Sequence, residues 1–329
     1  MNLDWEKILR FTLRRVGMSM LLVASVITIV FFIAHLAPGD PLSSMFSPTI
    51  SPSVAEVTRA QFGLDKPILV QYFVWVRNCL RGDFGNSISH GRPVGELIAS
   101  FLPNTILLAS VAIAVEFVIG IMLSLVAIRR QRKAAERIVS HASLLVCTIP
   151  TFWIGVMLVG VCSFVLGILP SSQMYSIGAE DFPLAVRLAD LAKHIVLPAL
   201  TIAIPGSAII TRYFTANLTK LQNEEYLLFA RSYGISEKRL FCSYEFPNAA
   251  VPLITFFGLE LGTLLTGALV TETIFSWPGM GRLTLMAIGS RDYPLVMGCT
   301  VVAGGVVIIG NLVADLLYIL VDPRVRVEG

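Results

Sequence analysis

The feature that most limits the fold of this chain is a series of long apolar segments spread over its whole length. Of its 329 residues, 55% are hydrophobic and 14% are charged, whereas about a quarter are charged in an ordinary water-soluble domain. A run of 18 or more mostly apolar residues indicates a transmembrane helix, because a helix satisfies its own backbone hydrogen bonds in hydrocarbon. We therefore expect an all-α integral membrane protein.

Six segments of this kind predict six transmembrane helices. They are Gly17–Leu36, Asn104–Ile128, His141–Leu169, Ile195–Thr211, Val251–Thr271 and Val296–Leu320. The fourth is the least regular, because Pro198 and Pro205 are expected to break it. A single transmembrane domain over residues 1–329 is predicted, with no internal repeat.

The lysine and arginine residues are unevenly distributed among the connections. Sixteen of the 25 lie in residues 1–16, 129–140, 212–250 and 321–329. Because basic residues are retained on the cytoplasmic side of a membrane, both termini are expected to be cytoplasmic. The cluster at residues 129–133 is then an orientation signal rather than a nucleic-acid site. The first apolar run is too long for the core of a signal peptide and is expected to be retained.

Residues 37–103 form a predicted extracytoplasmic segment that is long enough to have structure of its own. Within it, Val54–Phe62 is predicted as a short helix and Gln71–Leu80 as a helix with a largely apolar surface. The second helix could lie on the bilayer surface or pack as a cap on other helices, and the two are compatible. Between the fifth and sixth apolar segments, Pro278-Gly279 beside aromatic residues predicts a re-entrant or interfacial hairpin.

A polar interval, Asn217–Asn248, separates the fourth and fifth apolar segments and predicts two short helices. The first is expected to end at Gly234, because glycine adopts the left-handed conformation at little cost. The second is expected to begin at Ser236, a residue type favoured before the first turn of a helix. Pro247 and Asn248 are expected to mark the return of the chain into the membrane.

Within this interval, Glu225 is expected to complement the positive end of a helix, and Arg231 to cap carbonyl groups near a helix C-terminus. These local roles could be the whole function of both residues. Taken by its spacing alone, the interval fits a rigid docking element and an ordinary surface loop equally well.

Ionisable residues inside transmembrane helices are costly and are therefore functional candidates. Glu116 and Glu260 could line a wet path and attract a cationic group, such as a peptide amine or a metal chelate. Asp315 is better explained by a hydrogen-bonded node with Asn311, which precedes it by four residues on the same helical face. The kinks expected at Pro150 and Pro205 fit either a path lining or ordinary packing. Pro150 and Pro205, together with Glu116 and Glu260, are therefore possible pathway-lining residues.

No catalytic, metal or cofactor site is predicted in this chain. The five cysteines are scattered and the four histidines lack the spacing of metal ligands. The phosphate-binding pattern G-x-x-x-x-G-K-[ST] is missing from the sequence. Any ATP and Mg²⁺ would therefore be bound by another polypeptide.

Several short motifs, in order along nearly the whole chain, resemble the permease subunits of dipeptide, oligopeptide and nickel ABC importers. They are Pro38-Gly39-Asp40-Pro41, Phe62-Gly63-Leu64-Asp65-Lys66-Pro67, Gly82-Asp83-Phe84-Gly85-Asn86-Ser87, Leu102-Pro103-Asn104-Thr105, Ile149-Pro150-Thr151-Phe152-Trp153, His194-Ile195-Val196-Leu197-Pro198-Ala199, Thr271-Glu272-Thr273-Ile274-Phe275-Ser276-Trp277-Pro278-Gly279 and Asp322-Pro323-Arg324. The interval 217–250 is similar to the cytoplasmic coupling loop of these permeases.

The resemblance implies a multi-pass subunit of a bacterial cytoplasmic (inner) membrane that forms half of a translocation pathway. Its implied partners are a related permease subunit, two ABC ATPase subunits and an extracytoplasmic substrate-binding protein, with a short peptide as the solute. A nickel or other metal-chelate importer is the alternative within the family. The implied coupling residues are Glu225, Tyr226, Ala230, Arg231, Gly234, Ser236, Pro247 and Asn248.

The sequence departs from the family pattern at a few positions. Ser232-Tyr233, Tyr244 and Phe246 replace expected small or basic residues of the loop, and Glu260 replaces an expected glutamine. A self-contained secondary transporter that uses Glu116 or Glu260 as an ion site stays open as an alternative. A non-transporting scaffold is a third interpretation.

Overall fold

The computed structural model describes residues 5–36, 66–128, 133–265 and 268–321, and the regular structure in them is helical. One isolated β-bridge, between Asn86 and Pro93, is the exception within these ranges. The all-α prediction is therefore confirmed for this part of the chain. The predicted helix Val54–Phe62, residues 129–132 of the basic cluster and the final Asp322-Pro323-Arg324 motif lie outside the described residues.

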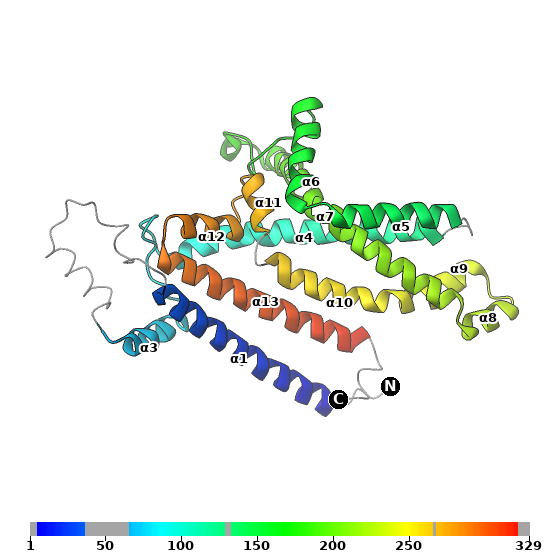
Figure 1. The fold of residues 1–329 in the computed structure, drawn as a ribbon, viewed down its shortest axis with the longest axis horizontal. Coiled ribbons are helices and arrows are strands. Elements are labelled where there is room, and N and C mark those ends of the chain that lie inside the picture. Colours follow the sequence, from blue (N-terminus) through cyan, green and yellow to red (C-terminus); the bar gives the residue numbers. More distant parts are fainter. Residues whose placement is uncertain (1–4, 37–65, 129–132, 266–267, 322–329) are drawn as a thin grey trace.

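Five long helices form the bundle in Figure 1. They are α1 (Trp5–Leu36), α4 (Val94–Ile128), α7 (Leu184–Gln222), α10 (Phe246–Leu265) and α13 (Tyr293–Val321). Helix α4 packs along α7, and α13 lies between α1 and α10. Gly120 lets α4 approach α7 closely, because a Cβ atom there would collide with Ile210. The Ser124 hydroxyl donates across this contact to the Thr211 carbonyl at 3.1 Å.

By length and composition, four helices among the described residues can cross a membrane, namely α1, α4, α7 and α13. A fifth span results if α5 (Lys133–Thr148) and α6 (Thr151–Leu158) are counted together. The predicted fifth segment, Val251–Thr271, is occupied by α10 and then by the separate α11 (Leu269–Ile274). The count of six spans therefore stays a prediction.

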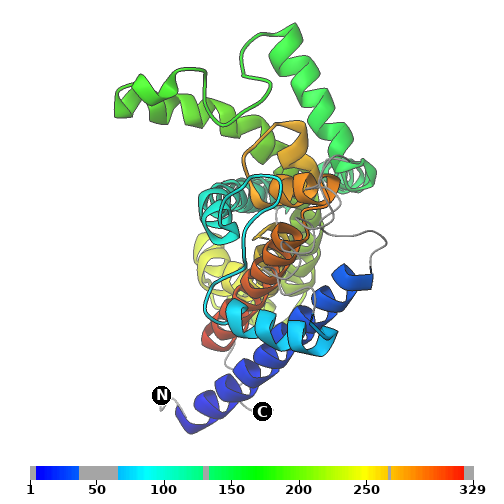
Figure 2. The same cartoon turned by 90° about the vertical axis from the view of Figure 1, so that its left-hand side faces the viewer.

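The kink expected at Pro150 is present within the third predicted span, His141–Leu169. Helices α5 and α6 meet at an angle of 99°, with Pro150 in the extended conformation between them. Proline lacks an N–H and disfavours a helical residue before it, so the helix stops at this point. Helix α6, the following π-helical turn Val159–Val165 and the start of α7 stand out from the bundle in both Figures 1 and 2.

The prediction that Pro198 and Pro205 break the fourth span is wrong. Helix α7 runs without interruption through both prolines for 39 residues. Pro198 lies in the part of α7 that is buried against neighbouring helices, and the Thr201 hydroxyl donates to the Leu197 carbonyl at 2.8 Å. Tertiary packing and local hydroxyl groups can keep a membrane helix intact around a proline. The two prolines therefore do not divide α7 into separate helices.

The outer helix α3 (Ile68–Cys79) confirms the helix predicted at Gln71–Leu80 and packs on α1. The hydroxyl groups of Tyr72 and Thr28 lie 2.7 Å apart, and the ring of Phe31 contacts those of Tyr72 and Trp75. Phe73 is 68% exposed on the other side. Helix α3 is thus a cap that also presents an apolar surface, as both interpretations require.

The turn predicted at Pro278-Gly279 is confirmed between α11 and α12 (Met280–Gly289), and its re-entrant or interfacial placement stays a prediction. The fully buried Glu272 accepts hydrogen bonds from the Thr105 hydroxyl at 2.8 Å and from the Arg282 N–H at 2.9 Å. The Trp277 indole donates to the carbonyl of Asn104 at 2.9 Å. Hydrogen bonds therefore join two motifs that are far apart in the sequence, residues 102–105 and 271–279.

A second node joins the outer loop to the start of α13. The buried carboxylate of Asp292 accepts hydrogen bonds from the Ser87 and Ser89 hydroxyls at 2.6 and 2.7 Å, and from the Leu295 N–H at 3.2 Å. Burial alone would raise the pKa of Asp292, but the bonds from Ser87 and Ser89 outweigh it and hold that pKa below its ordinary value. Asp292 therefore caps α13 and anchors the loop at once.

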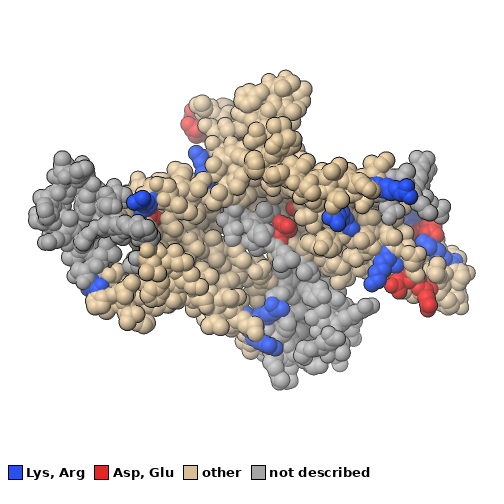
Figure 3. All heavy atoms as spheres, viewed as in Figure 1, with Lys and Arg blue, Asp and Glu red and all other residues tan. Residues whose placement is uncertain are grey.

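One end of the molecule gathers the ends of several bundle helices. Helices α4 and α7 end there and α10 begins there, near α8 (Glu225–Ser232) and α9 (Glu237–Leu240), whereas the start of α1 and the end of α13 lie apart from α8 in the lower part of the view (Figure 1). Most of the charged side chains visible in Figure 3 lie over the same end. The cytoplasmic orientation of both termini stays a prediction.

Candidate functional site

The polar interval folds into two short helices at the end of the bundle, as predicted. Helix α7 ends at Gln222, α8 follows at Glu225–Ser232, and α9 follows at Glu237–Leu240. We call residues 223–245 the knuckle. It joins α7 to α10, two helices that also pack against each other in the bundle.

Gly234 makes the bend between α8 and α9. Its φ of +75° is in the left-handed region, and its N–H donates to the Arg231 carbonyl at 3.0 Å. A Cβ atom at this position would meet nothing within 4 Å, so the requirement for glycine is conformational rather than steric. Ser236 stands at the predicted start of α9, but its side chain makes no capping bond, and its carbonyl accepts the Leu240 N–H at 2.9 Å.

A small apolar core holds the two helices together. Leu227 and Leu240 are fully buried, and Ala230 is nearly so. Leu221, Ile235 and Tyr244 pack around them partly buried. Burying a leucine side chain stabilises a fold by about 2 kcal/mol, so this core is enough to give the knuckle a definite shape.

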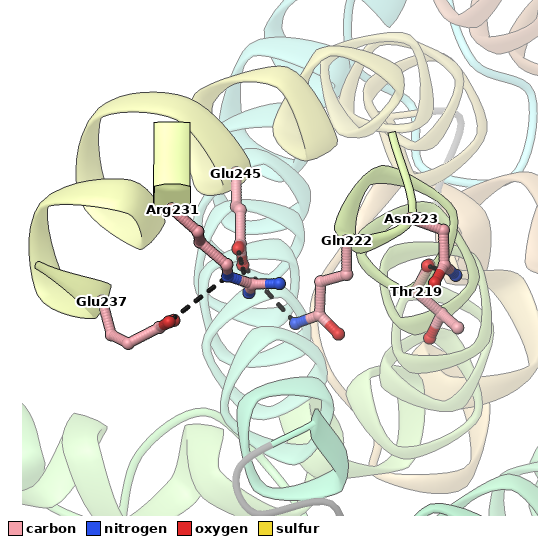
Figure 4. A network of polar contacts seen from close by, with 6 residues as sticks. All are labelled: Thr219, Gln222, Asn223, Arg231, Glu237 and Glu245. Carbon is pink, nitrogen blue, oxygen red and sulfur yellow. Dashed lines mark hydrogen bonds and ion pairs between the residues drawn. The ribbon is translucent and has the colours of Figure 1, made fainter. Parts of the chain in front are cut away.

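Arg231 joins the knuckle to the start of α10 through a buried carboxylate. Its guanidinium lies 3.4 Å from Glu245, whose side chain is 4% exposed, and 3.2 Å from the largely exposed Glu237 (Figure 4). From the end of α7, the Gln222 amide donates to the other Glu245 oxygen at 3.5 Å. We call Arg231, Glu245 and Gln222 the latch. The expected capping of helix-end carbonyls by Arg231 is thus replaced by ion pairs.

The outer surface of α8 is apolar and aromatic. Tyr226, Leu228, Phe229 and Tyr233 are between 42% and 73% exposed, and the rings of Phe229 and Tyr233 lie 4.6 Å apart. Glu225 is exposed in the first turn of α8, where a negative charge complements the helix dipole. An exposed aromatic surface on a rigid element is typical of a protein interaction site.

Pro247 does not interrupt the helix, and the expected return of the chain into the membrane at Pro247 and Asn248 stays a prediction. Helix α9 continues through a π-helical turn, Phe241–Glu245, into α10. A π-turn widens the helix before a proline whose missing N–H cannot bond one turn back. The Asn248 side chain donates to the Tyr244 carbonyl at 2.6 Å. The second half of the knuckle is therefore a direct extension of a bundle helix.

Two of the predicted path-lining residues come together in the middle of the bundle. Glu116 on α4 is 2% exposed and interacts electrostatically with Glu260 on α10. Its carboxyl group lies against Gly206 on α7, next to Pro205, where a Cβ atom would collide with it. Pro150 is placed separately, at the bend between α5 and α6.

Sequence reasoning missed three residues of these sites: Glu245, Gln222 and Gly206. Glu245 is an isolated acid in the aromatic stretch Phe241–Phe246, which was the available signal. Gly206 follows a proline in an apolar segment, and nothing in the sequence pairs it with Glu116. The side chain of Asp315 lies outside the described residues, so its expected node with Asn311 stays a prediction.

Comparison with known proteins finds two family models that together cover most of the chain. The family model described as "Binding-protein-dependent transport system inner membrane component" matches residues 116–327, and a model of the corresponding N-terminal part matches residues 8–109. The chain is 36% identical to the oligopeptide transport system permease protein AppB of Bacillus subtilis, over 96% of this chain and 99% of that protein.

Two further relatives show the same full-length similarity. A probable D,D-dipeptide transport system permease protein, DdpB of Escherichia coli, is 35% identical over 94% of this chain and 95% of its own length. The glutathione transport system permease protein GsiC of Escherichia coli is 31% identical over 91% of this chain and 92% of its own length.

Proposed function

Because the chain belongs to the family of inner-membrane components of binding-protein-dependent transport systems, we propose that its knuckle is the docking site for the ATPase subunits of an importer. The chain is a permease subunit of an ABC importer and a multi-pass protein of the bacterial inner membrane. The observation that carries the proposal is the continuity of the knuckle with α10, together with the aromatic surface of α8.

The mechanism follows from how the knuckle is attached. An ATPase bound to the exposed face of α8 pushes on the apolar core of Leu227 and Leu240. Within the latch, Arg231 passes this load to Glu245 next to the start of α10, and Glu245 is bonded to Gln222 at the end of α7. Since α10 and α7 are bundle helices, a tilt of the knuckle opens or closes the path between this chain and its partner. ATP and Mg²⁺ stay on the ATPases, and this chain performs no catalysis.

A short peptide is the proposed solute. The relatives are named for oligopeptides, D,D-dipeptides and glutathione, all short chains with amine and carboxylate groups. The carboxyl pair Glu116 and Glu260 suits a passing peptide amine, because an opposite charge in a low-dielectric bundle is strongly attracted. A metal-chelate cargo such as a nickel complex is the alternative within the family.

The proposed complex contains this chain, a related permease, two ATPases and an extracytoplasmic binding protein. We place the knuckle end in the cytoplasm, with both termini there and six spans in all. The exposed apolar side chains of α6 and the π-helical turn, among them Phe164 and Val165, offer a surface to the second permease. The outer nodes at Glu272 and Asp292 then lie on the side of the binding protein.

A second candidate function is a secondary transporter driven by an ion gradient. The observation that favours it is the contact of Glu116 with Gly206 and its interaction with Glu260, an arrangement that a proton carrier can use. The continuous knuckle argues against it, since a self-contained carrier has no need of a docking element.

The test is uptake of radiolabelled dialanine into proteoliposomes that contain the full complex. We expect uptake that requires internal ATP and the binding protein and that resists a protonophore. Uptake that persists without ATP and stops with the protonophore would establish the secondary transporter instead. An E260Q variant keeps the knuckle and removes one carboxyl group of the central pair; unchanged uptake by E260Q would rule out Glu260 as an amine or ion site.

A further inference from the structure

The half of α7 nearest the knuckle has two unlike faces. Ile210, Phe214 and Leu218 are buried in a cluster with Ala249 and Leu253 of α10. The other face carries a polar stripe that repeats every four residues. Its members are Thr211, Arg212, Thr215, Thr219, Lys220 and Asn223. A side chain that faces lipid is expected to be apolar, so this stripe requires water or a polar occupant.

The stripe forms the floor of a groove of about 770 Å³. Ala127 of α4 and Val139 and Ser140 of α5 complete its walls, with Tyr213 and Ala216 of α7. This volume falls within the usual range of about 300–1,000 Å³ for small-molecule sites. At a rise of about 1.5 Å per residue, the stripe is about 18 Å long, enough for a peptide of several residues.

The groove has a positive charge and unused hydrogen-bonding capacity. Among the described residues, neither Arg212 nor Lys220 takes part in an ion pair, and both side chains are exposed. The Thr215 hydroxyl is buried and has no hydrogen-bond partner within the same part of the chain. Two cations beside a row of hydroxyl groups are suited to a carboxylate.

The groove also shares a helical turn with the latch. Thr219 and Asn223 line it, and the Asn223 amide donates to the Thr219 carbonyl at 2.9 Å, while Gln222 between them points to Glu245 (Figure 4). Thr211, at the other end of the groove, follows Gly206 by five residues on α7. The groove therefore connects the level of the Glu116 carboxyl to the knuckle.

We propose that the α4–α5–α7 groove is the exit site of this permease and that Arg212 and Lys220 bind the C-terminal carboxylate of the departing peptide. The inference rests on the proposed function for the identity of the solute. The central carboxyl pair then receives the amine and the groove receives the carboxylate, so the two ends of a zwitterionic peptide are recognised at different depths. A peptide in the groove would contact the same turn of α7 that carries Gln222 of the latch.

The first arm of the test measures the charge preference of the groove without transport. A T219C variant of the complete complex is treated in inside-out vesicles with a negatively or a positively charged thiosulfonate. Modification at position 219 is quantified by peptide mass spectrometry, so the native cysteines do not interfere. We expect the negative reagent to react about tenfold faster than the positive one. This preference should be lost when R212Q/K220Q is added. It should be kept in the control R187Q/K193Q, which removes two charges at the other end of α7. If the two reagents react at equal rates with T219C that keeps Arg212 and Lys220, the proposal is overturned.

The second arm identifies the occupant. Dialanine is expected to slow modification at position 219, whereas dialanine amide, which lacks the carboxylate, is not. Equal protection by both, or by neither, contradicts the proposal. Protection by added phosphatidylglycerol but not by dialanine would assign the groove to a lipid headgroup and also contradict it. R212K/K220R keeps the charges and is expected to behave as the natural chain, which covers the case in which R212Q/K220Q does not fold.

These outcomes are separable from failure of the proposed function. If the complex shows no ATP-dependent uptake of any peptide while the anion preference and dialanine protection at position 219 persist, the exit-site chemistry holds and the coupling mechanism fails. If uptake is present and the groove shows no anion preference, the exit site fails alone.

Discussion

Replacing Glu245 by glutamine should loosen the knuckle without changing its shape. The side chain of Glu245 is 4% exposed and lies 3.4 Å from the Arg231 guanidinium, which is 34% exposed. A hydrogen bond to a charged group contributes about 1.5–3 kcal/mol. Because the separation is long and Arg231 is partly solvated, we expect a contribution below this range, about 1 kcal/mol. At about 1.4 kcal/mol per factor of ten, this is roughly a fivefold increase in local opening.

The assay is amide hydrogen exchange over residues 225–240, followed by mass spectrometry of the purified complex. E237Q is the matched control, because Glu237 also pairs with Arg231 but has a side chain that is 76% exposed. An exposed pair contributes a few tenths of a kcal/mol, so exchange should rise less than about twofold. The reasoning is refuted if E245Q and E237Q change exchange equally, or if E245Q leaves it unchanged.

Three other predictions concern positions whose geometry is specific. G234A should destabilise the knuckle by about 1 kcal/mol through strain at positive φ, with G234N milder, as measured by the same exchange experiment; an equal cost for both would contradict this. G206A should lower the thermal midpoint in detergent by an amount equivalent to about 1–3 kcal/mol, and adding E116A should restore most of it, since the new Cβ collides with that carboxyl group. The lowered pKa of Asp292 means that its contribution to stability is present above its unfolded pKa of about 3.9 and is lost as the pH falls through the lower folded value. Thermal midpoints of the natural chain and D292N should therefore differ at pH 7, and the difference should shrink as the pH falls below about 3.9; a difference that does not change with pH would refute the predicted direction.

The sequence was sufficient for the features that depend on local chemistry. Apolar length and composition predicted the helical bundle, and Gly234 predicted the bend of the knuckle, because a left-handed residue there needs glycine. The hairpin around Pro278-Gly279 followed from its turn chemistry in the same way.

The features that depend on tertiary packing were not predictable. Pro150 turns its helix by 99°, whereas Pro198 and Pro205 leave α7 continuous, and the difference lies in what packs against each segment. The contact of Glu116 with Gly206 joins residues that are 90 positions apart in the chain. The latch was missed for the same reason, since Glu245 becomes significant only when the bend brings Arg231 beside it.

The central claim is that the knuckle docks an ATPase, and co-purification tests it most directly. The tagged chain and a G234P variant are expressed in the native membrane, extracted in mild detergent, and their bound proteins identified by mass spectrometry. Proline has no access to positive φ, so this variant cannot form the bend. The account predicts that ATPases with the phosphate-binding motif accompany the natural chain and are lost or reduced with G234P. A natural chain that purifies without an ATPase and still transports dialanine without ATP would contradict it.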